Sequence, residues 1–144
     1  MEDLRLGDQL VRYDRERTIA AYALVSAGGA DRCGCVHCRN LARQRSTVYP
    51  ESFRDVLLRI GIDPLKEGYV YDMVGPFDDR VRPTDGWFYF AGELIEAGEK
   101  LVSDGDFQYW FQPSFPRPPA CFGSDVAAIE FSAKIPWVLR EDPY

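Results

Sequence analysis

Three of the four cysteines in this 144-residue chain lie within six residues, in the stretch CGCVHC, and the single histidine lies among them. The spacing Cys33-x-Cys35-x-x-Cys38 can bring three sulfur atoms to one centre, as a tetrahedral zinc site with Zn–S distances of about 2.3 Å requires. A helix that starts near Cys38 would add free backbone N–H groups, which favour a thiolate. The spacing therefore predicts a structural metal site, with zinc as the ion.

A tetrahedral site needs a fourth ligand. His37 is adjacent, but in a helix a residue next to Cys38 points about 100° away from it. Cys121 lies in the Pro-rich stretch QPSFPRPPACFG and would have to reach the site from a distance. The ligand set that we expect is Cys33, Cys35, Cys38 and Cys121. His37 or a water molecule is the alternative for the fourth position.

The same cysteines allow a second interpretation, which is thiol-dependent redox chemistry with Cys35 or Cys38 as the attacking thiolate. It predicts a thiol of lowered pKa and a reversible bridge from Cys35 to Cys33 or to Cys38. Motifs for other chemistry are absent, because the sequence has no G-x-S-x-G, no phosphate-binding loop, no G-x-G-x-x-G and no H-E-x-x-H. The pair Asp78-Asp79 is typical of a solvated turn. We therefore expect a non-enzymatic protein with no catalytic residues and no organic cofactor.

Composition and length fit one folded domain over residues 1–144, with 46% hydrophobic and 14% aromatic residues. The formal charge of −6 argues against binding to nucleic acids or anionic membranes, which need a basic face. The charge is uneven, because residues 1–60 carry +2 and residues 61–144 carry −8. The acidic second part is therefore the part that we expect to face a protein partner.

No stretch approaches the roughly 18 consecutive apolar residues of a transmembrane helix. The apolar run Ile19–Ala30 follows a segment rich in Asp and Glu, whereas the first region of a signal peptide is short and positive. We therefore expect a cytoplasmic protein with reduced thiols. In that compartment clustered cysteines bind metal or do redox chemistry more often than they form structural disulfides.

The elements before and after the cysteine loop must position it. Gln9–Tyr13 and Thr18–Val25 have the composition of strands, with the polar residues Asp14–Arg17 as a turn between them. Val36–Arg45 has the periodicity of a helix that carries Cys38 on its apolar face. The loop would therefore join a strand to a helix.

A second helix is the clearest element of the chain. Pro50 suits its first position, Gly61 suits the left-handed residue just past its end, and Pro64 prevents continuation. Its apolar stripe comprises Phe53, Val56, Leu57 and Ile60. We expect these two helices, both in the N-terminal half.

After the second helix the chain becomes β-rich. The segments dense in aromatic and β-branched residues predict four strands, Tyr69–Val74, Trp87–Ile95, Phe107–Gln112 and Val126–Ala133. Successive strands without intervening helices pair antiparallel. The predicted fold class is α+β, with a mostly antiparallel sheet.

The aromatic strands alternate, so Trp87 and Trp110 share one face while Phe88 and Phe111 share the other. One of these faces must form the core. Packing in two layers favours a second face that is covered by helices or another sheet. An open face with tryptophans would instead offer a platform for a peptide, sugar or protein.

The cysteine spacing extends to C-x-C-x-x-C-x-N with Asn40, and other short motifs follow it. They are Tyr49-Pro50, Gly61-Ile62-Asp63-Pro64, Lys66-Glu67 and the closing Ile135-Pro136-Trp137-Val138-Leu139. This series resembles an uncharacterised family of small bacterial proteins, over roughly residues 30–140. The resemblance implies a single bacterial cytosolic domain and implies no particular reaction.

Taken together, these features predict a non-enzymatic zinc-binding domain that acts as a protein-interaction module. The metal would fix the first helix against the strand before it, and the acidic β-rich part would face the partner. One alternative is the thiol redox protein described above. The other is a small acidic inhibitor or immunity-type protein, by analogy of charge and size.

Overall fold

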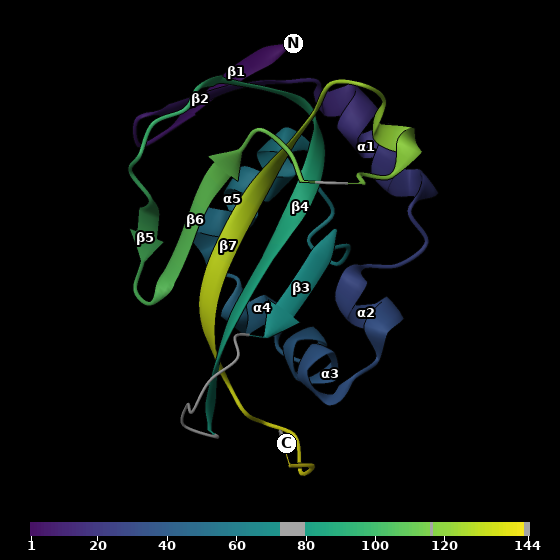
Figure 1. The fold of residues 1–144 in the computed structure, drawn as a ribbon, viewed down its shortest axis with the longest axis vertical. Coiled ribbons are helices and arrows are strands. Elements are labelled where there is room, and N and C mark those ends of the chain that lie inside the picture. Colours follow the sequence, from purple (N-terminus) through teal and green to yellow (C-terminus); the bar gives the residue numbers. More distant parts are fainter. Residues whose placement is uncertain (73–79, 116, 143–144) are drawn as a thin grey trace.

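The computed structural model describes residues 1–72, 80–115 and 117–142, and its main element is a seven-stranded antiparallel sheet (Figure 1). The strands follow the order β1-β2-β4-β7-β6-β5, and β3 also pairs with β4. Their bounds are β1 (Glu2–Leu6), β2 (Gln9–Tyr13), β3 (Tyr69–Asp72), β4 (Val81–Glu96), β5 (Val102–Asp104), β6 (Phe107–Gln112) and β7 (Val126–Pro136). The predicted α+β class with a mostly antiparallel sheet is confirmed.

The central strand is β4, which is 16 residues long. Its first part pairs with β3 and its last part with β2, while β7 runs along its other side from Val81 to Ala91. Gly92 allows the close approach of β2, because a Cβ there would lie 2.3 Å from the carbonyl oxygen of Arg12. The strand therefore joins the β1–β2 hairpin to the rest of the sheet.

Helical segments are more numerous than the two predicted. In the described residues they are α1 (Arg15–Leu24), α2 (Gly29–Cys33), α3 (Val36–Ala42), α4 (Arg45–Val48), α5 (Glu51–Ile60) and the 3-10 helix η1 (Ala120–Phe122). They are not confined to the N-terminal half, because η1 precedes β7. The predicted helix Val36–Arg45 is α3 followed by the separate α4. None of these helices combines the length and the apolar character that a membrane span requires.

Helix α5 forms as predicted from its sequence. It begins after Pro50, buries Phe53, Leu57 and Ile60, and ends at Gly61, whose φ of 96° lies in the left-handed region. The N–H of Ile62 then donates to the carbonyl of Leu57 at 2.9 Å, which closes the last turn. Figure 1 places α4 and α5 behind the sheet, and α1, α2 and α3 along the side next to β3 and β4.

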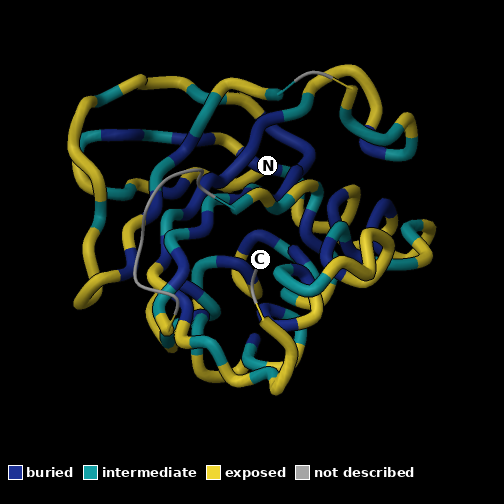
Figure 2. Tube along the Cα trace, turned by 60° about the horizontal axis from the view of Figure 1, so that its bottom comes forward, coloured by how far each residue is buried: buried dark blue, intermediate teal, exposed yellow. Residues whose placement is uncertain are grey.

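The core is aromatic and lies between α5 and the sheet. The ring of Phe53 lies 4.8 Å from that of Phe107 and 5.8 Å from that of Phe131, measured between centroids. The ring of Tyr49 packs edge-on against Phe131 at 5.2 Å. Figure 2 shows the buried residues gathered inside the trace and the exposed ones in its outer loops. These edge and tilted contacts are the arrangements that aromatic rings prefer in a core.

The strand predicted for Thr18–Val25 is wrong, because this segment belongs to α1. The side chain of Asp14 caps the helix by accepting from the N–H of Arg17 at 3.0 Å. The Ala-rich sequence that follows has high helix propensity. Thr18, Ala21 and Tyr22 are its buried residues, with helical spacing. The cap and this spacing were the signals for a helix in the sequence.

Most predicted strands are confirmed with changes at their ends. Gln9–Tyr13 and Phe107–Gln112 keep their bounds, while Trp87–Ile95 and Val126–Ala133 lie inside the longer β4 and β7. For the strand predicted over Tyr69–Val74, Tyr69–Asp72 form β3; Met73 and Val74, with Asp78-Asp79, lie outside the described residues. The strands β1 and β5 were not predicted, because neither is dense in aromatic and β-branched residues.

Helices of the described residues cover the second face of the sheet at one end. There α1 and η1 pack against Tyr89, whose backbone carbonyl accepts from the hydroxyl of Tyr22 at 2.6 Å. Elsewhere on this face Tyr69 is 53% exposed and Tyr71 is 36% exposed. The expectation of a face covered by helices therefore holds at that end, while Tyr69 and Tyr71 stay exposed.

Candidate metal centre

The three clustered cysteines lie where α2 meets α3. Cys33 is the last residue of α2, and Gly34 follows with φ of 67°, a conformation that glycine adopts at little cost. Cys35 is the N-cap of α3, and Cys38 lies in the first turn of that helix. This sharp turn brings the three side chains together.

The sulfur atoms of Cys33, Cys35 and Cys38 lie within 4.8 Å of one another. In a tetrahedral site with Zn–S distances of about 2.3 Å, neighbouring sulfurs are about 3.8 Å apart. Side-chain movements of about 1 Å would therefore close these thiols around such an ion. Three thiols this close together can hold a metal ion.

Backbone N–H groups donate to two of the sulfurs. The N–H of Cys38 donates to the sulfur of Cys35 at 3.5 Å, and the N–H of Cys35 donates to the sulfur of Cys33. A hydrogen bond to sulfur favours its ionised form. The loop backbone therefore favours the thiolate form of Cys33.

The thiols have different proton affinities. The pKa of Cys33 is lowered, first by the N–H of Cys35 and then by hydrogen bonds with the thiols of Cys35 and Cys38. The pKa of Cys38 is raised, first by burial and then by its interactions with the other two thiols. Three ionised sulfurs this close repel one another, and a bound divalent cation offsets that repulsion.

The cluster is open on one side. Cys33 and Cys35 are exposed, whereas Cys38 is 6% exposed and belongs to the core next to Leu41. An ion could therefore reach the sulfurs from solvent without any rearrangement of the core. One coordination position would face outward.

His37 does not join the sulfurs. Its Nδ1 lies 3.7 Å from Oδ2 of Asp72, and its ring packs edge-on against Trp137 with centroids 5.5 Å apart. Within the described residues this Nδ1 has no hydrogen-bond partner although it is buried. The side chain is thus directed towards β3, in agreement with the angular argument from the helix turn.

Cys121 is not brought to the other three cysteines either. Its sulfur donates to the carbonyl of Ala21 at 3.6 Å, and η1 is held on α1 by an edge contact between Phe122 and Tyr22 at 5.1 Å. Figure 1 shows η1 beside α1, away from the turn between α2 and α3. The structure therefore does not assemble the expected set of four cysteines.

The C-terminal segment holds α3 in place. The side chain of Asn40 hydrogen-bonds the backbone of Pro136 and of Val138. Arg39 donates to the carbonyl of Gly34 at 3.2 Å and forms an ion pair with Glu141, with Nη1 and Oε1 2.9 Å apart. Arg39 therefore lies against the cysteine loop.

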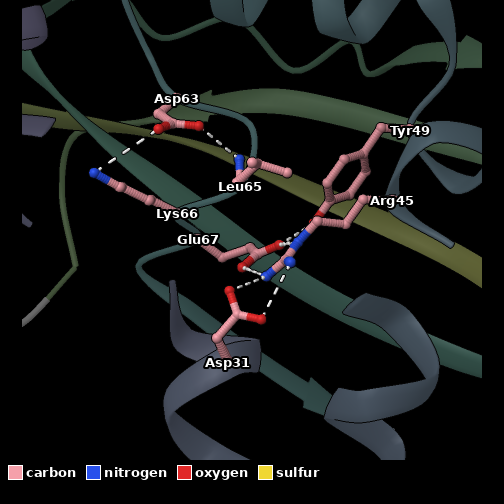
Figure 3. Close-up of polar contacts among 7 residues, drawn as sticks. All are labelled: Asp31, Arg45, Tyr49, Asp63, Leu65, Lys66 and Glu67. Atoms are coloured by element: carbon pink, nitrogen blue, oxygen red, sulfur yellow. Dashed lines mark hydrogen bonds and ion pairs between the residues drawn. The ribbon is translucent and has the colours of Figure 1, made fainter. Parts of the chain in front are cut away.

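A buried ion-pair network holds α2 and α4 together (Figure 3). Arg45 binds Glu67 through two hydrogen bonds of 2.8 Å and Asp31 through two of 3.0 and 3.3 Å. The hydroxyl of Tyr49 donates to Glu67 at 2.8 Å. The side chain of Glu67 is fully buried, and that of Arg45 is 10% exposed. The helix that ends at Cys33 is thereby tied to the segment before β3.

Sequence reasoning missed this network because its members are far apart in the chain. One signal was present, since the predicted helix placed Arg45 on the apolar face shared with Cys38 and Leu41. A charged residue on a buried face needs a charged or hydrogen-bonding partner. The sequence does not say which of the 23 acidic residues that partner is.

A comparison of the chain with protein-family models, curated proteins and solved structures found no match.

Proposed function

We propose that this chain is a small zinc-binding domain that acts as a non-enzymatic protein-interaction module. The observation that carries the proposal is the convergence of three sulfurs within 4.8 Å on one short loop. Thiolate ligands and tetrahedral spacing favour zinc over ions that prefer oxygen. In this role the ion links the end of α2 to the start of α3.

The charge of such a site fits its surroundings. Zinc with three thiolates carries a net charge of −1, and a nearby cation stabilises it. Arg39 lies against the loop, and its pKa is raised by Glu141 first and to a smaller degree by Cys35. The fourth position goes to water or to a donor from a partner, because neither His37 nor Cys121 reaches the sulfurs.

Metal analysis of protein purified without added metal tests the proposal. We expect about one equivalent of zinc in the unmodified chain and less than about half in the Cys35→Ser variant. Cys121→Ser and His37→Gln are the matched controls, and each should keep the full equivalent. Less than about half an equivalent in the unmodified chain would contradict the proposal.

The exposed position and the lowered pKa of Cys33 favour thiol redox chemistry as a second candidate function. The two candidates differ in the rate of alkylation by iodoacetamide. Zinc-bound thiolates react slowly until a chelator is added, whereas free redox thiols react at once and faster as pH rises. Fast alkylation without a chelator, together with a reversible bridge between two of the clustered cysteines, would favour redox chemistry.

A further inference from the structure

The second face of the sheet carries a group of aromatic and acidic side chains at the end that α1 and η1 leave uncovered. We define this aromatic–acidic patch by its five residues, Tyr69, Tyr71, Asp85, Trp87 and Glu130. They come from the three adjacent strands β3, β4 and β7. Figure 1 shows these strands in front of α5, with no helix across them.

The strand register places the five residues on the same face. Tyr69 lies opposite Trp87, and Trp87 lies opposite Glu130. In the next row Tyr71 lies opposite Asp85. Directly opposite residues of antiparallel strands point to the same side of a sheet, and so do residues two apart on one strand. The two rows therefore form one continuous surface.

The aromatic part of the patch is ordered by ring contacts. Tyr69 stacks on Trp87 with centroids 5.2 Å apart, and Tyr71 packs edge-on against the same indole at 6.2 Å. Phe115 stacks on Trp87 at 4.0 Å, so this indole is held between neighbours. The rings that remain open to a ligand are those of Tyr69 and Tyr71, which are the exposed ones.

In the described residues, the two carboxylates of the patch lack an ion-pair partner. Oδ2 of Asp85 accepts from the hydroxyl of Tyr71 at 3.4 Å, and Glu130 is 8% exposed beside them. Within the described part of the chain, no lysine or arginine forms an ion pair with Asp85 or Glu130. Burial and the charge of Asp85 raise the pKa of Glu130 to about 7. A cation placed here would relieve this repulsion.

We propose that the aromatic–acidic patch binds an arginine side chain on a basic segment of a protein partner. A guanidinium stacks on aromatic rings and also forms paired hydrogen bonds with a carboxylate, so it matches both parts of the patch. The charge of −8 on residues 61–144 attracts such a segment. This inference rests on the proposed interaction role and names its surface, and it does not depend on the metal.

A peptide titration of the full chain tests this directly. The probe is an acetylated and amidated Gly-Arg repeat peptide, followed by ¹H–¹⁵N spectra at low salt. The indole signal of Trp87 should move on titration. That of Trp137 should not, because its N–H donates to the carbonyl of Glu141 beside α3. A peptide with citrulline in place of arginine has the same shape without the charge and should leave both signals in place.

Matched variants distinguish binding at the patch from attraction by the overall negative charge of the chain. Asp85→Asn with Glu130→Gln should weaken peptide binding by about tenfold, and Tyr71→Leu should also weaken it. Glu99→Gln with Asp106→Asn removes two carboxylates from exposed positions outside the patch and should change the affinity by less than about twofold. Equal weakening by the two double variants would overturn the proposal, since the peptide would then sense only net charge.

Two further outcomes would also overturn it. One is binding of the citrulline peptide as tight as that of the arginine peptide. The other is a neutral oligosaccharide that moves the Trp87 signal equally in the unmodified chain and in the Asp85→Asn/Glu130→Gln variant, because the platform would then bind sugar. The zinc content and the peptide binding test two different proposals. Zinc without peptide binding rejects the patch, and peptide binding without zinc rejects the metal site.

Discussion

Asn40 of α3 uses its side-chain amide to pair with the backbone of Val138 just after β7. The N–H of Val138 donates to Oδ1 of Asn40 at 3.0 Å, while Nδ2 of Asn40 donates to the carbonyl of Pro136, also at 3.0 Å. Asn40 is only 2% exposed. The amide therefore takes the place of a neighbouring strand where the sheet ends, and it attaches the helix of Cys38 to the end of β7.

Replacing Asn40 with Ala should lower the free energy of unfolding by about 1–3 kcal/mol, because the two part-buried hydrogen bonds of this side chain, to the backbone of Pro136 and of Val138, are lost. Urea denaturation followed by circular dichroism measures the change. Thr47→Ala is a suitable control, since its hydroxyl makes only an exposed bond to the carbonyl of Gln44. A loss for Asn40→Ala no larger than that of the control would refute the anchoring role.

Replacing Glu67 with Gln should lower the free energy of unfolding by about 3–5 kcal/mol, because Arg45 would lose its fully buried ion-pair partner. Asp31→Asn should cost about 1 kcal/mol or less, because the side chain of Asp31 is 46% exposed. Thermal and urea unfolding of both variants test the order of the two effects. A larger loss for Asp31→Asn than for Glu67→Gln would contradict the prediction.

Replacing Glu130 with Gln should change how stability depends on pH. The folded pKa of Glu130 is about 7 and its ordinary value is 4.5, so between these values the native chain binds more protons than the unfolded chain. Its contribution to stability is therefore present at low pH and is lost as pH rises towards 7. The free energy of unfolding of the variant should equal that of the unmodified chain near pH 4. At pH 8 it should be higher by on the order of 1 kcal/mol.

Unfolding curves at several pH values between 4 and 8 provide this measurement. Glu99→Gln is the control, because this side chain is exposed. A constant difference between Glu130→Gln and the unmodified chain over the whole range would contradict the prediction.

Removal of the metal should loosen the connection between α2 and α3. A chelator should lower the melting temperature by several degrees, and zinc should restore it, because an ion that binds only the folded chain stabilises it. Cys121→Ser should show the same shift as the unmodified chain, and Cys38→Ser should show none. Equal responses of Cys38→Ser and the unmodified chain would place the metal elsewhere.

Local signals in the sequence were sufficient for several elements. Helix α5 was predicted because its apolar stripe, Pro50 and Gly61 all lie within a dozen residues of each other. The proximity of Cys33, Cys35 and Cys38 likewise follows from spacing within one turn. In contrast, α1 was misread because Ile19, Tyr22 and Val25 suggested a strand, although Asp14 caps a helix.

Long-range contacts could not be derived in the same way. The sequence showed that the side chains around Trp87 alternate between the two faces of the sheet. It did not show how many helices would cover the second face. The distance of Cys121 from the other cysteines depends on the packing of η1 on α1. The partners of Arg45 lie 14 and 22 residues away from it, and no periodic pattern connects them.

The network around Arg45 has a consequence for how this sequence can vary over time. Substitution of Arg45, Glu67 or Tyr49 alone leaves a charged or polar group in the interior without a partner. Sequences that carry only one such substitution should therefore fold poorly. Asp31 tolerates change more readily because water reaches it. Descendants of this chain should therefore inherit the three interior positions as a set, or exchange them together for apolar residues.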